Sequence, residues 1–298
     1  MSIVEKALQK AQAKPERTGT TERAADGAAA PAYQAPASST DGPHDGVDVI
    51  ATATAMGREC RGGSVTLDVQ RLRNDGRLAP EKLAQQTEEE FRRIKWPVLN
   101  AITRREGVAP AVNNIVLVTS AIPGEGKTFN ALNLALSIAR EGNSNVFLLD
   151  LDMRNPTLCN NLGVVPPVDM NEYLSGDGRP EDLLFSIGVD NLLLAGSVTS
   201  TNRASELLAT RGVEKLFSYI RSIAPQPLVL VDLPPVLATD DALVVAPMID
   251  ACLLVLSEGR SRRDSAAEAI ALLSEFTLAG IVLNRSRAAI KDYHYSYS

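Results

Sequence analysis

From about residue 115 onward, short apolar runs alternate with amphipathic stretches that have helical spacing. This pattern predicts strands at 115–120, 146–150, 191–195, 228–231, 251–256 and 280–283. It predicts helices at 127–140, 170–174, 204–209, 213–224 and 263–275. Apolar strands separated by helices indicate an α/β fold, with a parallel sheet covered by helices on both faces. A ligand of such a sheet should bind at the carboxyl ends of the strands.

The chain before this core has a different pattern. Residues 1–64 are mostly Ala, Pro, Gly, Ser and Thr, which predicts a disordered segment apart from a short helix at 2–13. Residues 65–110 regain patterned Val, Leu and Arg, and we expect a helical lead-in there. Its main helix should start at Pro80 and be interrupted near Pro97. The core domain is then expected at 111–288, followed by a tail at 289–298.

Composition narrows the classes of function. The chain has 298 residues, 45% of them hydrophobic, and a net charge of −6, which argues against a general nucleic-acid binder. Its three cysteines, Cys60, Cys159 and Cys252, form no metal spacing and fit a reducing cytosol. There is no apolar run near the roughly 18 residues of a membrane span, and no signal-peptide core. We therefore expect a cytoplasmic protein whose membrane role, if any, depends on a partner.

Residues 120–128 carry the first chemical signal, a glycine-rich loop that ends in Lys127 and Thr128. A predicted strand leads into this loop and a predicted helix follows it, which is the context of a phosphate-binding loop. Gly124 and Gly126 leave the backbone free to point its N–H groups at phosphate oxygens. Lys127 can then reach the outer phosphates, and Thr128 can ligate Mg²⁺. The alternative is an ordinary glycine turn, which the strand and helix context disfavours.

Three aspartates follow predicted strands and form the second signal. Asp150 and Asp152 lie at the end of the second strand, and Asp232 closes the fourth. Carboxylates beside a triphosphate would repel it unless a divalent cation intervened, so they imply Mg²⁺. Each aspartate alone could equally be a helix cap or a turn residue.

The last residues of the chain form the third signal. Tyr293, Tyr295 and Tyr297 alternate with polar residues, although the chain has only six tyrosines. Their spacing is compatible with an edge strand. No apolar residue lies between them, however, and chain ends are usually mobile. We interpret the tail as a phosphorylation substrate.

Together these motifs resemble the bacterial tyrosine kinases, a family built on a phosphate-loop ATPase. The motifs are the loop at 123–128, the Asp-x-Asp-x-Arg sequence at 150–154, the Asp-x-Pro-Pro sequence at 232–235 and the tyrosine cluster. They occur in the family's order, and the resemblance covers about residues 80–298. It implies a P-loop NTPase fold of the MinD/ParA-like (SIMIBI) type and an ATP-dependent protein-tyrosine autokinase. The implied role is regulation of exopolysaccharide or capsule polymerisation or export.

The resemblance and the chemistry together give each position a role. Lys127 should contact the β- and γ-phosphates of ATP, and Asp152 should accept the tyrosine proton. Arg154 is expected to hold a phosphate or a neighbouring subunit. The set expected around ATP and Mg²⁺ comprises Gly124, Glu125, Gly126, Thr128, Asp150 and Asp232. Asn284 resembles the adenine-contacting asparagine of the wider ATPase superfamily, with a plain strand-end turn residue as the alternative.

Partners are also implied by resemblance. Glu89, Arg92 and Lys95 resemble the family's Glu-x-x-Arg-x-x-Arg oligomerisation helix, with a solvated charged helix face as the alternative. Residues 3–8 and 92–97 resemble the stand-alone, exosortase-associated subgroup. The implied partners are a ring-like homo-oligomer, a separate membrane chain-length protein and a tyrosine phosphatase. The chain would then lie in the cytoplasm, peripheral to the inner membrane.

Two other functions stay open at this point. One is a P-loop ATPase that positions division sites or partitions chromosomes, although Ile122 and Pro123 replace the signature Lys-Gly of those proteins. The other is a catalytically silent nucleotide-binding adaptor of a polysaccharide export complex, although every expected catalytic residue is present.

Overall fold

The computed structural model describes residues 63–65, 67–78, 84–103 and 114–286. Several predictions lie outside these residues: the short helix at 2–13, the N-terminal segment up to residue 62, the helix start at Pro80 and the tail tyrosines Tyr293, Tyr295 and Tyr297. Within the described residues, no helix is long and apolar enough to cross a membrane.

A seven-stranded sheet forms the centre of the described part of the chain, with the order β3-β4-β2-β5-β1-β6-β7. The strands are β1 (Asn114–Ser120), β2 (Val146–Asp150), β3 (Phe185–Ser186), β4 (Leu192–Ala195), β5 (Leu228–Asp232), β6 (Ala251–Ser257) and β7 (Leu278–Asn284). Every paired neighbour is parallel except β3, which runs antiparallel to β4 at one edge. The six predicted strands are confirmed. The two-residue β3 was missed because it is too short to show a period.

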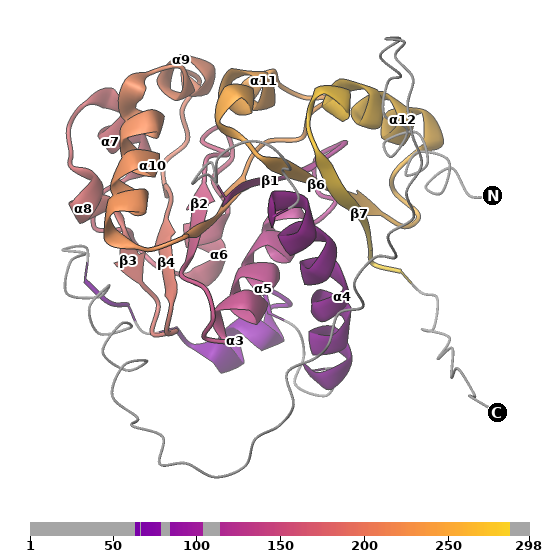
Figure 1. Ribbon diagram of the computed structural model, residues 1–298, viewed down its shortest axis with the longest axis horizontal. Helices are drawn as coiled ribbons and strands as arrows, with labels where there is room; N and C mark the ends of the chain where they lie inside the picture. The colour runs from indigo at the N-terminus through magenta and orange to yellow at the C-terminus, as the bar shows by residue number, and fades with distance from the viewer. Residues whose placement is uncertain (1–62, 66, 79–83, 104–113, 287–298) are drawn as a thin grey trace, which may run out of the picture.

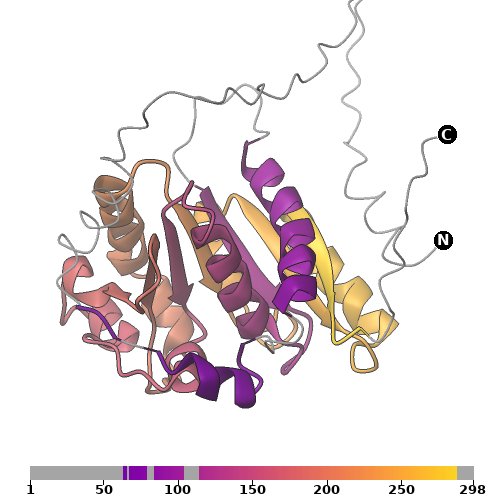
Figure 2. The same ribbon diagram turned by 90° about the horizontal axis from the view of Figure 1, so that it is seen from below.

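Helices cover both faces of this sheet (Figures 1 and 2). One layer contains α3 (Val69–Asn74), α4 (Ala84–Thr103), α5 (Lys127–Ala139) and α6 (Leu158–Leu162). The other contains α7 (Met170–Ser175), α8 (Pro180–Leu183), α9 (Ala204–Leu208), α10 (Arg211–Ile223), α11 (Asp241–Val245) and α12 (Arg263–Leu272). The five predicted core helices are confirmed, with the end of the last one, Leu273–Glu275, being 3₁₀. The short helices α6, α8 and α11 were not predicted.

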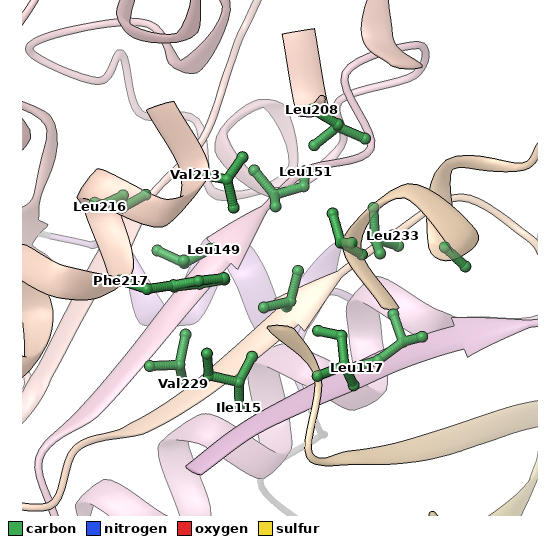
Figure 3. Packing of buried hydrophobic residues seen from close by; sticks show 14 of the residues in the cluster. Ile115, Leu117, Leu149, Leu151, Leu208, Val213, Leu216, Phe217, Val229 and Leu233 are labelled. Atoms are coloured by element: carbon green, nitrogen blue, oxygen red, sulfur yellow. The ribbon is translucent and has the colours of Figure 1, made fainter. Parts of the chain in front are cut away.

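Alternating side chains along the central strands divide the core into two halves. On β1, Ile115 and Leu117 face one apolar cluster, whereas Val116 and Val118 face the other. The same alternation holds on β2 and β5, as expected for strands buried on both faces. Figure 3 shows the first cluster, in which Phe217 of α10 packs beside strand residues. Packing on both faces therefore holds the central strands in place. The predicted ligand site lies at the carboxyl ends of these strands.

The prediction that the lead-in helix is interrupted near Pro97 is wrong. Helix α4 continues to Thr103 with Pro97 inside it. A proline removes one helical hydrogen bond but does not forbid a helix whose face is buried. Phe91 and Val98 are 5% and 0% exposed, so packing on the core outweighs the local penalty.

Candidate nucleotide-binding site

The glycine loop connects β1 to α5, as the sequence predicted. Gly124 and Gly126 have φ values of 79° and 95°, which favour glycine. A Cβ on Gly126 would lie 2.1 Å from the side-chain nitrogen of Asn284, so a larger residue cannot fit there. A Cβ on Gly124 would lie 2.9 Å from the guanidinium of Arg260. The backbone conformation therefore favours glycine at both positions, and a larger residue would also displace the side chain of Arg260 or Asn284.

Glu125 lies in the predicted glycine loop, with its side chain turned into the protein. Its side chain is 0% exposed and does not line the cavity beside the loop. One carboxylate oxygen accepts a 2.8 Å hydrogen bond from the Ile122 backbone N–H, and the other accepts a hydrogen bond from the Ser261 hydroxyl. Its carbonyl accepts a 2.8 Å bond from Asn284. The Glu125 side chain therefore fixes the shape of the loop rather than binding a ligand.

Lys127 lies at the centre of the site. Its Nζ is 2.7 Å from a carboxylate oxygen of Asp152 and 3.2 Å from one of Asp232. The second Asp232 oxygen accepts a 2.5 Å hydrogen bond from the Thr128 hydroxyl. Asp152 and Asp232 are 3% and 0% exposed. The two predicted aspartates thus converge on the lysine and threonine of the loop, as expected for residues at adjacent strand ends.

Asp150 lies directly beside Asp232, because the two are register partners on β2 and β5. One of its oxygens accepts a hydrogen bond from the Asp152 N–H, and the other accepts bonds from the N–H groups of Thr157 and Leu158. Asp150 therefore shapes the loop that carries Asp152. Thr157, which was not predicted, has its hydroxyl 3.0 Å from that of Thr128. No local motif marks Thr157, because only the fold brings it to the loop.

Burial controls the titration of this cluster. Desolvation raises the pKa of Asp150 to about 7, with a further contribution from the neighbouring Asp232. Desolvation also raises the pKa of Asp232, against the opposing charge of Lys127. Burial alone would lower the pKa of Lys127, but the charges of Asp232, Asp152 and Asp150 raise it above its ordinary value. Three carboxylates thus share one buried cation, an arrangement that favours a further positive charge.

Mg²⁺ fits this donor set. Hard oxygen ligands are available from Thr128 and Asp232, with Asp150 able to act through water. Among the described residues, no group of three or more His, Cys, Asp or Glu side chains could hold a metal alone. Mg²⁺ in nucleotide sites usually takes only one or two carboxylates and completes its shell with phosphate and water oxygens. The residues therefore suit a metal that arrives with a nucleotide.

Arg154 contacts side chains of α9 and α11. Its Nε lies 3.3 Å from the carboxylate of Asp241, and its Nη2 donates a 2.8 Å hydrogen bond to Ser205. Asp241 is 0% exposed and also accepts a hydrogen bond from Ser205. Arg154 thus ties the loop after β2 to α9 and α11. Asp241 was not predicted, because nothing in the sequence links it to Arg154.

The three residues of α4 predicted to contact another subunit differ in exposure. Lys95 is only 7% exposed and forms an ion pair with Glu141, at the end of α5. Glu89 and Arg92 are exposed. Lys95 therefore fixes α4 to its own core, which leaves Glu89 and Arg92 as the members that another subunit could contact.

A cavity of about 440 Å³ lies beside the glycine loop. Gly124, Gly126, Lys127, Thr128 and Asn284, all predicted as nucleotide-binding, line it. Unpredicted residues complete the lining, among them Arg77, Asn155, Thr157, Asn161 and Arg285. Its position at the carboxyl ends of β1 and β7 matches the location expected for a ligand of a parallel sheet.

Comparison with known proteins finds similarity to tyrosine-protein kinases. No protein-family model matches the chain. The tyrosine-protein kinase YwqD of Bacillus subtilis (strain 168) is 30% identical over 184 residues, covering 61% of this chain and 76% of that protein. The tyrosine-protein kinase CpsD of Streptococcus agalactiae is 27% identical over 213 residues, or 70% and 88%. The solved kinase domain of the Escherichia coli tyrosine kinase ETK is 28% identical, with a TM-score of 0.53 over 64% of this chain and 74% of that one.

Proposed function

The chain belongs to the bacterial tyrosine kinases, and from this premise we propose that it transfers the γ-phosphate of ATP to the tyrosines of its own C-terminal tail. One observation carries the proposal: Lys127 bridges Asp152 and Asp232 at the loop where the phosphates would lie. This places one cation, one metal-binding carboxylate and one candidate base within a single buried cluster.

The loop and the lysine would position the phosphates. Backbone N–H groups of the glycine loop and the N-terminus of α5 favour an anion. On nucleotide binding, Lys127 would exchange its carboxylate partners for the β- and γ-phosphates. Thr128 and Asp232 would hold Mg²⁺, which supplies charge neutralisation of the transferring group. Positioning and charge stabilisation provide most of the catalysis in phosphoryl transfer.

Asp152 is the candidate acceptor of the tyrosine proton. It lies on the loop after β2 rather than within the strand, and its other oxygen accepts a 3.2 Å hydrogen bond from the Asn155 N–H. A phenol has an unperturbed pKa near 10, so a positioned carboxylate assists its attack at neutral pH. Release of Lys127 toward the phosphates would free the Asp152 oxygen that the lysine contacts.

Tyr293, Tyr295 and Tyr297 are the proposed phosphate acceptors, with the transfer occurring between subunits. Glu89 and Arg92 on α4 would contribute to the contact that brings subunits into a ring-like homo-oligomer. The remaining proposed partners are a membrane chain-length protein of exopolysaccharide or capsule assembly and a tyrosine phosphatase. Asn284 would contact the adenine.

Radiolabelled ATP separates this proposal from its two competitors. A tyrosine kinase incorporates label from γ-labelled ATP into the protein, and the label is lost when Tyr293, Tyr295 and Tyr297 are replaced by Phe. A partition-type ATPase releases labelled phosphate without modifying the protein. A silent adaptor retains intact ATP. Label that persists in the triple-Phe variant would refute the tail as the substrate.

Mixing two variants tests transfer between subunits. A Lys127→Met protein with an intact tail is incubated with a catalytically intact protein that carries the three Tyr→Phe substitutions. We expect phosphate on the Lys127→Met protein alone. An unlabelled Lys127→Met protein, under conditions where wild type is labelled, would show that transfer occurs within one chain.

A further inference from the structure

The charged side chains that line the cavity all have one sign. Within the described residues they are Lys127, Arg77 and Arg285, and no carboxylate lines the cavity. This basic lining occurs in a chain whose net charge is −6. Lys127 is already engaged with the buried aspartates. Arg77 and Arg285, in contrast, are exposed residues that also line the cavity.

Arg77 and its neighbour Gly76 come from outside the strand-and-helix core that carries the other lining residues. Both belong to the strap, by which we mean residues 63–65 and 67–78. Figures 1 and 2 show α3 of the strap beside the layer formed by α5 and α6. At one end, the Val65 N–H donates a 2.8 Å bond to the Ser186 carbonyl of the edge strand β3. At the other, Leu72 and Leu78 are 2% and 8% exposed in the same apolar cluster as α5.

The backbone of Arg77 is held by the capping geometry of α3. Gly76 has a φ of 67°, and its N–H donates to the Arg73 carbonyl at 3.1 Å. The Arg77 N–H donates to the Leu72 carbonyl at 2.8 Å. This pair of bonds is the Schellman arrangement, in which glycine ends the helix and the next residue is often apolar. Here that next residue is an exposed arginine, and the apolar contact is made by Leu78 instead.

We propose that Arg77 binds the phosphate chain of the nucleotide, so that the strap forms a second, basic wall of the site. A guanidinium recognises phosphate oxygens through charge-assisted hydrogen bonds. The cap and the two buried leucines hold the position from which it does so. Packing of the strap does not need the charge, because the buried leucines supply its apolar contacts. The inference rests on the nucleotide site of the proposed function and assigns that site a binding residue.

Binding measurements on the full chain test this role without relying on catalysis. Wild type, Arg77→Met, Arg77→Gln and Arg77→Lys are titrated with a fluorescent ADP analogue, and inorganic tripolyphosphate is used as a competitor without a base. The matched control is Arg71→Met, which removes the same charge from α3, the short helix that immediately precedes Arg77. The Arg71 side chain is 67% exposed, pairs with Asp75 and does not line the cavity. Melting temperatures of the free proteins report on packing.

We expect the two neutral Arg77 variants to bind both the ADP analogue and tripolyphosphate about 10-fold more weakly, the loss typical of a hydrogen bond to a charged group. Arg77→Lys should recover part of the affinity, and Arg71→Met should bind like wild type.

Unchanged affinity in both neutral variants would overturn the proposal. Weaker ADP binding with unchanged tripolyphosphate binding would also overturn it, because Arg77 would then contact the nucleoside. An equal loss in Arg71→Met would show a general charge effect and would overturn it too.

The outcomes separate this inference from the proposed function. If wild type transfers phosphate but the Arg77 variants bind normally, only the second wall is wrong. If binding depends on Arg77 but no phosphate reaches tyrosine, the second wall stands and the kinase proposal fails.

Discussion

The nucleotide cavity has two walls that are held in different ways. The first wall is the glycine loop and the aspartates behind it, which sit at the ends of hydrogen-bonded strands, with Asp150 and Asp232 in register. The second is the strap that carries Arg77, which is held by two buried leucines and a helix cap. The first wall contains charges that depend on one another, since Lys127 touches two carboxylates at once. The second wall contributes the exposed charge of Arg77, and the packing of the strap does not depend on that charge. Changes to the first wall should therefore alter the phosphoryl transfer itself, and at the metal-site aspartates also the affinity, whereas changes to the second wall should alter the affinity alone.

Lys127→Met gives the largest expected effect. It removes the cation that offsets the transferring phosphate, so the rate of tyrosine phosphorylation should fall by roughly 10³-fold or more. The fold should persist at neutral pH, because burial raises the pKa of Asp150 and of Asp232, and these two carboxyl groups can take up protons when the lysine is absent. Phosphorylation is followed with labelled ATP, and the fold by circular dichroism. Phosphorylation near the wild-type rate would place the chemistry outside the first wall.

Within the first wall, Asp232→Asn and Asp152→Asn should have different consequences. Asp232 contacts both Lys127 and Thr128, so its variant should lose about 100-fold in affinity for Mg²⁺–ADP. Asp152 is proposed to act on the acceptor, so its variant should bind within about threefold of wild type while the transfer rate falls by about 10²-fold. Titration and single-turnover assays measure the two quantities. Equal losses of affinity would mean that these roles are assigned wrongly.

Leu72→Ala tests how the second wall is held. The leucine is 2% exposed, so its truncation should cost about 2–4 kcal/mol of unfolding free energy. Nucleotide affinity should fall as well, to about the level of Arg77→Met, because the strap would no longer fix that arginine. Val69→Ala on the same helix is the control, since Val69 is 43% exposed. Denaturant unfolding and ADP titration give the two values. A stability loss with full affinity would separate the strap from the site.

A change of pH should affect the first wall and leave the second unchanged. The folded pKa of Asp150 is raised to about 7 from an ordinary value of 3.8, so the folded chain holds this proton more tightly than the unfolded chain. Its contribution to stability is fully present below about pH 4 and is lost as the pH rises through about 7. Mg²⁺–nucleotide binding needs the ionised carboxylate, so affinity should rise about 10-fold from pH 6 to 8.

Asp150→Asn is the reference for this pH effect. The variant should show a weaker dependence of both stability and affinity on pH than wild type. The affinity change caused by Arg77→Met should itself be independent of pH, because arginine does not titrate in this range. A pH profile of Asp150→Asn that matches wild type would assign the titration to another group.

The sequence predicted the first wall well because its residues lie in contiguous motifs. Lys127, Thr128, Asp150, Asp152 and Asp232 follow apolar strands, and adjacent parallel strands end at one edge of a sheet. The second wall was not predicted, since Arg77 reaches the cavity only when Leu72 and Leu78 pack on the core.

Side-chain partners account for most of the other differences. Glu125 and Arg154 carry the expected residue types, but Glu125 accepts a hydrogen bond from Ser261 and Arg154 pairs with the buried Asp241. Lys95 likewise pairs with Glu141. A motif defines which residues are present, but the direction of each long side chain depends on partners that are distant in sequence. Thr157 was not predicted, because only the fold brings its hydroxyl close to that of Thr128.

Phosphorylation of the tail by this site is tested most directly by a phosphopeptide map. Purified wild-type protein and the Lys127→Met variant are each incubated with ATP and Mg²⁺, digested and examined by mass spectrometry. We predict phosphate on Tyr293, Tyr295 or Tyr297 in wild type and none on these residues in the variant incubated alone. A wild-type tail that remains unmodified while ATP is consumed, or a variant tail that is modified to the same extent, would contradict the account.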